Sequence, residues 1–350
     1  MKNTYILIYI IITITSLRSF AQDVHFSQFW NTPLLQNPSF SGKANEPIRA
    51  IVNYRSQWGS ITSNPFKTFG ANFDMRFRTS SKGNSFAGGI SMYTDVAGAS
   101  KMRTTLANLS GAYHLNLDNR NHLSAGLQVG INQKSIDSYD LRFDNQFDGF
   151  GHNPNLSSNE NLVNSSEIRP TVSAGISYMW SNSFNSQSNR YVRNKRMINI
   201  GFSVHHFNAP KYYFSHQEEL GFRYIGSIEA SFNLSTTPWS IKPYAFVAVQ
   251  RKATDIVLGT LFEYAINNES QITNFKKGLS VGFGGLYRFQ DAIIPTFQIQ
   301  WDSFQIGFNY DVNLSQLSIA SKGNGGFELS LKYIFKNSLI KNRSKIRKRY

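Results

Sequence analysis

The stretch FELSLKYIF, residues 327–335, decides the fold because apolar and polar side chains alternate along it. Glu328, Ser330 and Lys332 share one parity. The other parity is entirely apolar or aromatic and consists of Phe327, Leu329, Leu331, Tyr333 and Phe335. Consecutive side chains of a β-strand point to opposite faces of the sheet, so this run would separate an apolar environment from a wet one.

One such strand is compatible with any half-buried sheet, but the same alternation recurs through most of the chain. We count fourteen candidate strands, and most of them have the ten or so residues that a tilted membrane strand needs. They lie near residues 48–58, 66–78, 86–94, 104–118, 122–134, 168–181, 196–207, 220–234, 241–250, 254–265, 278–288, 293–301, 304–313 and 325–335. The pattern predicts an all-β fold, a closed antiparallel transmembrane β-barrel of about fourteen strands in a bacterial outer membrane.

The N-terminus has the form of a secretory signal peptide. Lys2 precedes an apolar core over residues 5–17, and the small residues Ser19 and Ala21 allow cleavage before Gln22. The apolar core is too short to span a bilayer well. The chain has no cysteine, so it offers neither a disulfide framework nor a cysteine lipid anchor.

The composition also favours a membrane barrel. Charged residues make up only 16% of the chain, compared with about 25% in soluble domains. Aromatic residues reach 14%, and Tyr and Trp are typical of the zones where a barrel wall meets lipid headgroups. Of the net charge of +15, the signal segment supplies two positive charges and the last fifteen residues supply seven, so the basic character is mostly a tail.

We therefore divide the chain into four parts. Residues 1–21 form the signal peptide, 22–47 a lead-in, 48–335 the barrel and 336–350 a basic periplasmic tail. Pro33 and Pro38 prevent the lead-in from pairing as a central strand. It either fills the lumen, where inward-facing Gly and Ser leave room, or reaches the periplasmic machinery.

An even number of strands predicts that both termini lie in the periplasm, where bacterial barrels have their short turns. The turns at 118–121 and 302–303 would then be periplasmic, and the polar loop 135–167 would lie outside the cell. The connection 181–195 is longer than this rule expects.

The lead-in carries the most specific motifs of the chain. They are QDVHFSQF at 22–29, Pro33-Leu34, Asn37-Pro38 and Gly42, followed by NYRSQW at 53–58 and the strand at 66–74. Further pieces lie at 89–98, with Tyr93-Thr94-Asp95, and at 201–206, 311–315 and 326–335. In this order the mature chain resembles the PorP/SprF family of Bacteroidetes.

The resemblance implies an outer-membrane protein of the type IX secretion system and gliding motility. It implies a barrel that helps to export, or to hold at the surface, a large adhesin-type protein. The implied partners are that secreted protein, periplasmic secretion components and outer-membrane lipid, with no nucleic acid and no cofactor. It implies no enzymatic activity.

Catalytic and metal sites are weakly supported by the residues themselves. His205 and His206 are adjacent on a predicted strand, so we expect them to point to opposite faces. Asp95 and His216 form no arguable triad. The loop beginning at Asp144 lacks the bidentate acid that an EF-hand calcium site requires at its twelfth position, which is Asn155. We predict no catalytic and no metal site.

Three groups of residues are candidates for binding partners. The first lies in the lead-in, the second consists of aromatic residues in a polar loop, and the third belongs to the basic tail. The tail is either a solvated end without a partner or a segment that docks on acidic partners or anionic headgroups. These candidates are His25, Phe26, Gln28 and Phe29, then Phe143, Phe147 and Phe150, and finally Arg347, Lys348 and Arg349.

Two other functions remain open at this point. A barrel of this size with a Gly-rich inner face also suits an outer-membrane channel for small or hydrophobic solutes, of the fatty-acid-channel type. A soluble secreted β-sandwich is the third possibility.

Overall fold

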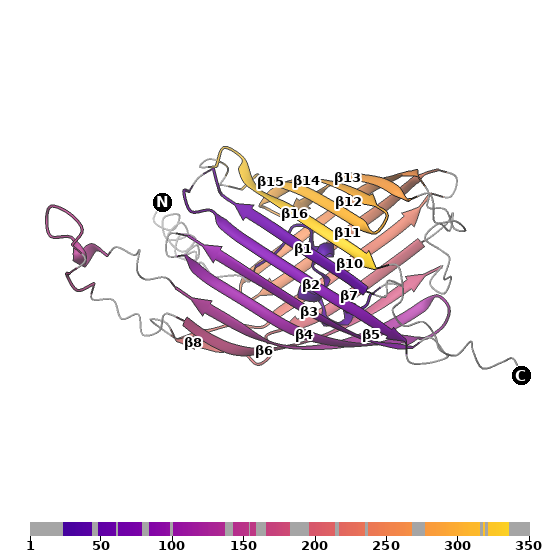
Figure 1. Ribbon diagram of the computed structural model, residues 1–350, viewed down its shortest axis with the longest axis horizontal. Helices are drawn as coiled ribbons and strands as arrows, with labels where there is room; N and C mark the ends of the chain where they lie inside the picture. The colour runs from indigo at the N-terminus through magenta and orange to yellow at the C-terminus, as the bar shows by residue number, and fades with distance from the viewer. Residues whose placement is uncertain are drawn as a thin grey trace, which may run out of the picture.

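The computed structural model describes residues 24–43, 48–60, 62–78, 84–98, 101–136, 143–153, 155–158, 166–182, 196–213, 217–234, 237–267, 277–315, 318 and 321–335. Fourteen strands close into one antiparallel barrel (Figure 1). They are β1 (Ile48–Gln57), β2 (Phe66–Arg78), β3 (Ser85–Ala97), β4 (Met102–Asn116), β5 (Asn121–Ser135), β6 (Ser166–Ser181), β7 (Arg196–His205), β10 (Arg223–Asn233), β11 (Trp239–Gln250), β12 (Ala253–Asn267), β13 (Leu279–Arg288), β14 (Ala292–Trp301), β15 (Phe304–Asn313) and β16 (Asn324–Phe335).

Each barrel strand pairs with its neighbours in chain order, and β1 pairs with β16 to close the sheet. Between β7 and β10 the chain forms a separate two-stranded hairpin, β8 (Lys211–Tyr213) and β9 (Gln217–Glu219). The predicted fold class and strand count are confirmed, and each barrel strand overlaps one predicted range. The predicted signal peptide lies in residues outside the described part of the chain.

Most polar side chains of the strands face the lumen and most apolar ones face outward, as the alternation in the sequence predicts. On β16, Glu328 is 1% exposed and faces the lumen, whereas Leu329 is 45% exposed and faces outward. Aromatic residues gather near both ends of the outer wall, as expected where a barrel meets lipid headgroups. At one end Phe304 packs on Tyr333 with ring centroids 4.6 Å apart, and at the other Tyr54 packs on Phe327 at 5.8 Å.

The predicted turns 118–121 and 302–303 lie at the barrel end where β16 finishes. The long connection from β5 to β6 and the β8–β9 hairpin belong to the opposite end (Figure 1). Of the predicted long link 181–195, residues 183–195 lie outside the described part of the chain. In the described residues no helix is long and apolar enough to cross a membrane.

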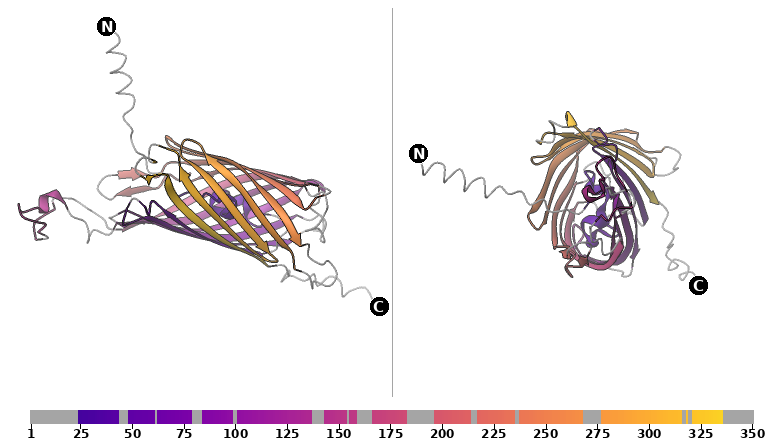
Figure 2. Two further views of the ribbon diagram at one scale, coloured as in Figure 1. Left: turned by 90° about the horizontal axis from the view of Figure 1, so that it is seen from above. Right: turned by 90° about the vertical axis from the view of Figure 1, so that its left-hand side faces the viewer.

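Residues 24–43 lie inside the barrel and form three single turns (Figure 2). These are η1 (Phe29–Asn31), α2 (Pro33–Gln36) and η2 (Pro38–Phe40). Each proline begins a turn, where its missing N–H costs no helical hydrogen bond. The Asn37 side chain accepts a hydrogen bond from the Ser39 N–H and so caps η2. We call residues 24–43 the lumenal segment.

Candidate functional site

The lumenal segment is buried inside the barrel and is bound to the wall by many hydrogen bonds. Leu34 and Phe40 have no exposed surface, and Gln28 and Phe29 are also buried. The segment makes no strand pairing with the wall. Side chains from many strands of the wall, β1 among them, hold both of its halves.

The first half is held by a charge cluster consisting of Arg55, Arg288, Asp311 and Glu328. Glu328 accepts hydrogen bonds from the backbone N–H groups of Ser27 (2.7 Å) and Gln28 (3.0 Å). Asp311 accepts from the Ser27 hydroxyl and pairs with Arg55 and Arg288, each at 2.9 Å. All four charged side chains are at most 5% exposed. Removing one partner of such a network would leave a buried charge without compensation.

The second half is held by an ion pair near the closing strands. Arg49 on β1 pairs with Asp74 on β2 at 2.8 Å. Arg49 also donates to the Phe40 carbonyl, and Asp74 accepts from the Gly42 N–H. On β4, His114 Nε2 donates to the Ser41 carbonyl at 2.7 Å. The end of the lumenal segment is thus fixed by its backbone groups.

Glycines on the inner wall make room for the lumenal segment. A Cβ added to Gly126 would lie 2.5 Å from the Pro38 carbonyl carbon, and one added to Gly201 would lie 2.6 Å from Phe40 Cζ. Real Cβ atoms essentially never make such close contacts. Six wall glycines meet the segment in this way and form what we call the glycine trough: Gly70, Gly89, Gly126, Gly175, Gly201 and Gly307.

One aromatic side chain of the segment enters an apolar pocket of the wall. Phe29 is 2% exposed and stacks on Phe246 with ring centroids 5.0 Å apart. Val257, Leu286 and Ile294 belong to the same buried cluster. Phe26 is also buried and lies against Gly70.

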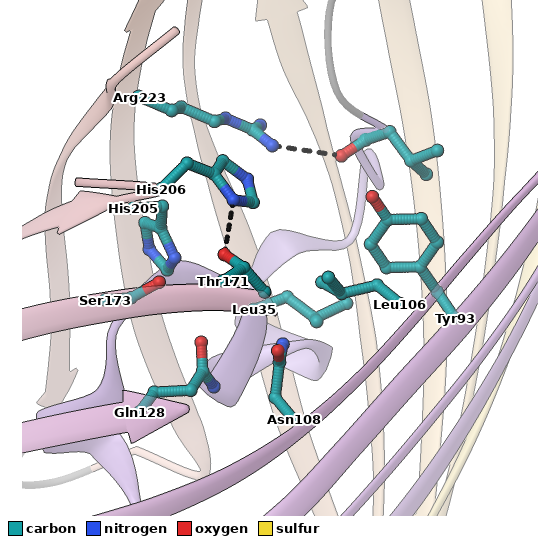
Figure 3. A pocket seen from close by; sticks show the side chains of 11 residues that line it. Leu35, Tyr93, Leu106, Asn108, Gln128, Thr171, Ser173, His205, His206 and Arg223 are labelled. Atoms are coloured by element: carbon teal, nitrogen blue, oxygen red, sulfur yellow. Dashed lines mark hydrogen bonds between the residues drawn. The ribbon is translucent and has the colours of Figure 1, made fainter. Parts of the chain in front are cut away.

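A small cavity remains between the lumenal segment and the wall formed by β3–β7 and β10 (Figure 3). Its volume is about 20 Å³, which is room for roughly one water molecule. His205 Nε2 donates to the Gln36 carbonyl at 2.9 Å, and Arg223 donates to the Val24 carbonyl at 3.3 Å. The cavity is lined by both polar and apolar side chains.

The prediction that His205 and His206 point to opposite faces was wrong. Both side chains are buried and line this cavity (Figure 3). β7 ends at His205, and His206 has a φ of 57°, in the left-handed region. This turn breaks the alternation of the extended strand, and His206 Nδ1 meets the Thr171 hydroxyl at 2.6 Å.

The surroundings of His25 in the lumenal segment disfavour the protonated form of its ring. Its Nε2 is enclosed and has no hydrogen-bond partner among the described residues. Burial, and then the positive charges of Arg55, Arg288 and Arg223, lower the pKa of His25 well below its ordinary value of about 6.5. The neutral ring is therefore the form that fits the lumen.

Acidification should accordingly loosen the lumenal segment. A released His25 binds a proton more readily than a seated one, so its contribution is complete above about pH 6.5 and is lost as the pH falls below that value. The loss is up to about 1.4 kcal/mol per pH unit. Protease accessibility of the segment at pH 7.5 and 5.0 measures the effect, and His25→Asn should reduce it. Identical pH profiles for the two proteins would contradict this role of His25.

The aromatic loop, residues 143–153, lies in the connection between β5 and β6, beyond the end of the barrel (Figure 1). Phe147 bridges to His152, and the Asp148 carboxylate accepts the N–H groups of Phe150 and Gly151. Phe147 is 61% exposed and Phe150 is fully exposed, whereas Phe143 is half-buried. The loop thus displays two phenylalanines to its surroundings.

The structure does not test the remaining predicted residues. Arg347, Lys348, Arg349 and His216 lie outside the described residues. Within the described ranges, no three His, Asp or Glu side chains are arranged to hold a metal ion.

A family model described as "Type IX secretion system membrane protein PorP/SprF" matches residues 18–333. The chain belongs to the PorP/SprF family. It is therefore an outer-membrane β-barrel component of the type IX secretion system, as the resemblance in the sequence implied. The expectation that this PorP/SprF protein has no catalytic activity agrees with that description and stays a prediction.

Solved structures resemble this PorP/SprF barrel at low sequence identity. A Pseudomonas aeruginosa FadL homologue is 10% identical, with a TM-score of 0.47 over 85% of this chain and 93% of that chain. A TodX deltaS2S3 mutant, described as a monoaromatic hydrocarbon channel, is 9% identical, with a TM-score of 0.45 over 86% and 92%. These similarities concern the barrel fold alone. No match was found among curated protein sequences.

Sequence reasoning did not identify the wall residues that hold the lumenal segment of this PorP/SprF protein. Arg55 lies on the first strand of the barrel, whereas Arg288, Asp311 and Glu328 lie on three of its last four strands. Their one signal in the sequence is a charge on the inward-facing parity of an alternating strand. Such positions are costly unless the charge is paired, so each could have been marked as a contact inside the lumen.

Proposed function

We propose that this protein is a non-enzymatic component of the type IX secretion and gliding machinery that binds a large secreted adhesin-type protein and helps to export or anchor it. Membership of the PorP/SprF family supports a role in secretion. The observation that carries the choice of protein binding over solute conduction is the lumenal segment. It occupies the interior that a solute would have to cross.

A channel for small or hydrophobic solutes is disfavoured by the same observation. The cavity beside the lumenal segment has a volume of about 20 Å³, far below the 300–1,000 Å³ of ordinary small-molecule pockets. Conduction would require displacement of residues that are held by buried ion pairs. Single-channel recordings of the purified barrel should therefore be silent.

We further propose that both termini lie in the periplasm and that the aromatic loop lies outside the cell. In this arrangement the loop is available to the exported protein, and the basic tail with Arg347, Lys348 and Arg349 is available to periplasmic components or anionic headgroups. His25, Phe26, Gln28 and Phe29 could contact a partner only after leaving the lumen. Deletion of residues 336–350 that leaves secretion unchanged would remove the tail from this account.

Affinity purification tests the proposed function. The tagged protein is extracted from outer membranes in detergent, and co-purifying proteins are identified by mass spectrometry. We expect one large adhesin-type protein together with other type IX secretion components. Recovery of the barrel alone, in good yield and conducting in bilayers, would instead support the solute channel.

Replacing Phe147 and Phe150 by Ser should weaken binding of the secreted partner. Aromatic anchors at protein interfaces are each worth about 2 kcal/mol or more, so the loss of one would lower the affinity by roughly 30-fold. Phe289→Ser is the matched control, because Phe289 is a 56% exposed phenylalanine in the β13–β14 turn. Equal recovery of the partner with both variants would exclude the aromatic loop as the contact.

A further inference from the structure

The wall around the lumenal segment recognises backbone groups of a peptide. Glu328 accepts two successive N–H groups, and Asp74 accepts the Gly42 N–H. Backbone carbonyls of the segment accept hydrogen bonds from seven wall side chains on five strands, β1, β4, β5, β7 and β10. These donors are Arg49, Arg55, His114, Gln128, Ser203, His205 and Arg223. Contacts to the backbone do not depend on the identity of the bound side chains.

The side-chain requirements are correspondingly few. The glycine trough accommodates the path of the chain, and the pocket around Phe246 accepts one large aromatic side chain, Phe29. Just before it, the Gln28 amide donates to Asn309 and lies against Gly307. The wall therefore suits an irregular peptide in which polar residues precede an aromatic anchor.

The lumenal segment is also physically separable from the barrel. It contributes no strand to the sheet, and the wall closes through the pairing of β1 with β16. The chain between Lys43 and Ile48 is the covalent connection from the segment to the first strand. Departure of the segment would thus leave the hydrogen bonds between the strands intact.

We propose that the inner wall is a peptide-binding site, with residues 24–43 as its resident ligand, and that a segment of the exported partner with the same chemistry occupies it when the resident segment leaves. This inference rests on the proposed function for the source of the competing peptide. The existence of the peptide-binding site does not rest on the proposed function, because residues of the barrel wall form it. Because a short tether gives the resident segment an effective concentration in the millimolar range, the competing segment must itself be held nearby.

The experiment uses the complete chain with a protease site introduced between residues 43 and 48. The folded protein is cleaved in detergent, and its barrel is shown to remain heat-modifiable on a gel. A fluorescent peptide with the sequence of residues 24–43 is then added in excess, and its anisotropy is measured. In a second measurement the cleaved barrel is unfolded in urea and refolded with the peptide present, which removes slow release of the resident segment as an obstacle.

We expect the peptide to bind with one site per barrel, and the same peptide carrying Phe29→Ala to bind about 100-fold more weakly or worse. Failure to bind in both measurements by a folded barrel would overturn the proposal. Equal binding of the two peptides would also overturn it, because the aromatic pocket would then play no part. Neither result depends on affinity purification of the secreted partner, so the two proposals fail separately.

Discussion

Gly126→Val should make residues 37–40 leave the lumen more often while the wall of the barrel stays intact. The added side chain would meet the backbone of Pro38 and Ser39, which cannot move aside as the end of a flexible side chain could. Overpacking of this kind costs about 1–3 kcal/mol, which raises the population of the released segment by roughly 5- to 150-fold. Single-channel recordings should show openings that are absent from the unsubstituted protein.

Gly111→Val provides the matched control for this substitution. Gly111 lies on the adjacent strand β4 opposite Leu127 and faces outward, where an added Cβ meets nothing within 4 Å. The control barrel should fold equally well and remain silent. If Gly126→Val is as silent and as protease-resistant as the control, the lumenal segment does not lie along the glycine trough.

Asp311→Asn should destabilise the folded barrel by about 3–5 kcal/mol. The substitution removes a buried carboxylate that pairs with Arg55 and Arg288 and accepts from Ser27, so two buried guanidinium groups lose their shared partner. Urea unfolding in lipid vesicles, followed by tryptophan fluorescence, measures the loss of free energy of unfolding. Adding Arg288→Gln should cost less than the sum of the two single changes, because the two residues interact directly.

Asp302→Asn is the comparison at the surface. Asp302 pairs with Lys277, which is 52% exposed, and exposed ion pairs are worth at most about 1 kcal/mol. Asn also tolerates the φ of 54° at this position. A similar loss of stability for both substitutions would mean that the charge cluster is solvated and does not anchor the lumenal segment.

The strands could be predicted because their signal is local. On β16 the apolar Phe327 faces outward and the charged Glu328 faces the lumen. Apolar and polar side chains alternate in the same way along most of the other strands of the wall. Turns such as Asp302–Ser303 separate successive runs, so fourteen strands could be counted without knowing any contact between them. A closed barrel was predicted because many alternating strands of this length in one chain are typical of a membrane barrel.

The arrangement inside the lumen could not be predicted in the same way. Ser27 and Glu328 are 301 residues apart, and nothing local to either residue indicates their hydrogen bond. The Gly-rich inner face showed that space was available, and Pro33 and Pro38 showed that the lead-in was no strand. Only the folded wall brings Asp311, Arg288 and Arg55 to one place. His206 eluded prediction because a single left-handed residue reverses the parity on which the prediction depended.

An engineered disulfide between the lumenal segment and the wall tests the account most directly. The Ser39 and Ser177 hydroxyls lie 2.9 Å apart, and the chain has no cysteine of its own, so Ser39→Cys with Ser177→Cys introduces the only two thiols. Ser39→Cys with Ile176→Cys is the control, because Ile176 lies on the outer face of β6 and is 57% exposed. After mild oxidation of intact outer membranes, the protein is denatured in SDS before labelling, so that burial alone protects no thiol. We predict that the first pair is then protected from maleimide through a reducible bond and that the control pair is not. Full labelling of both thiols in the first pair would contradict the placement of residues 24–43 inside the barrel.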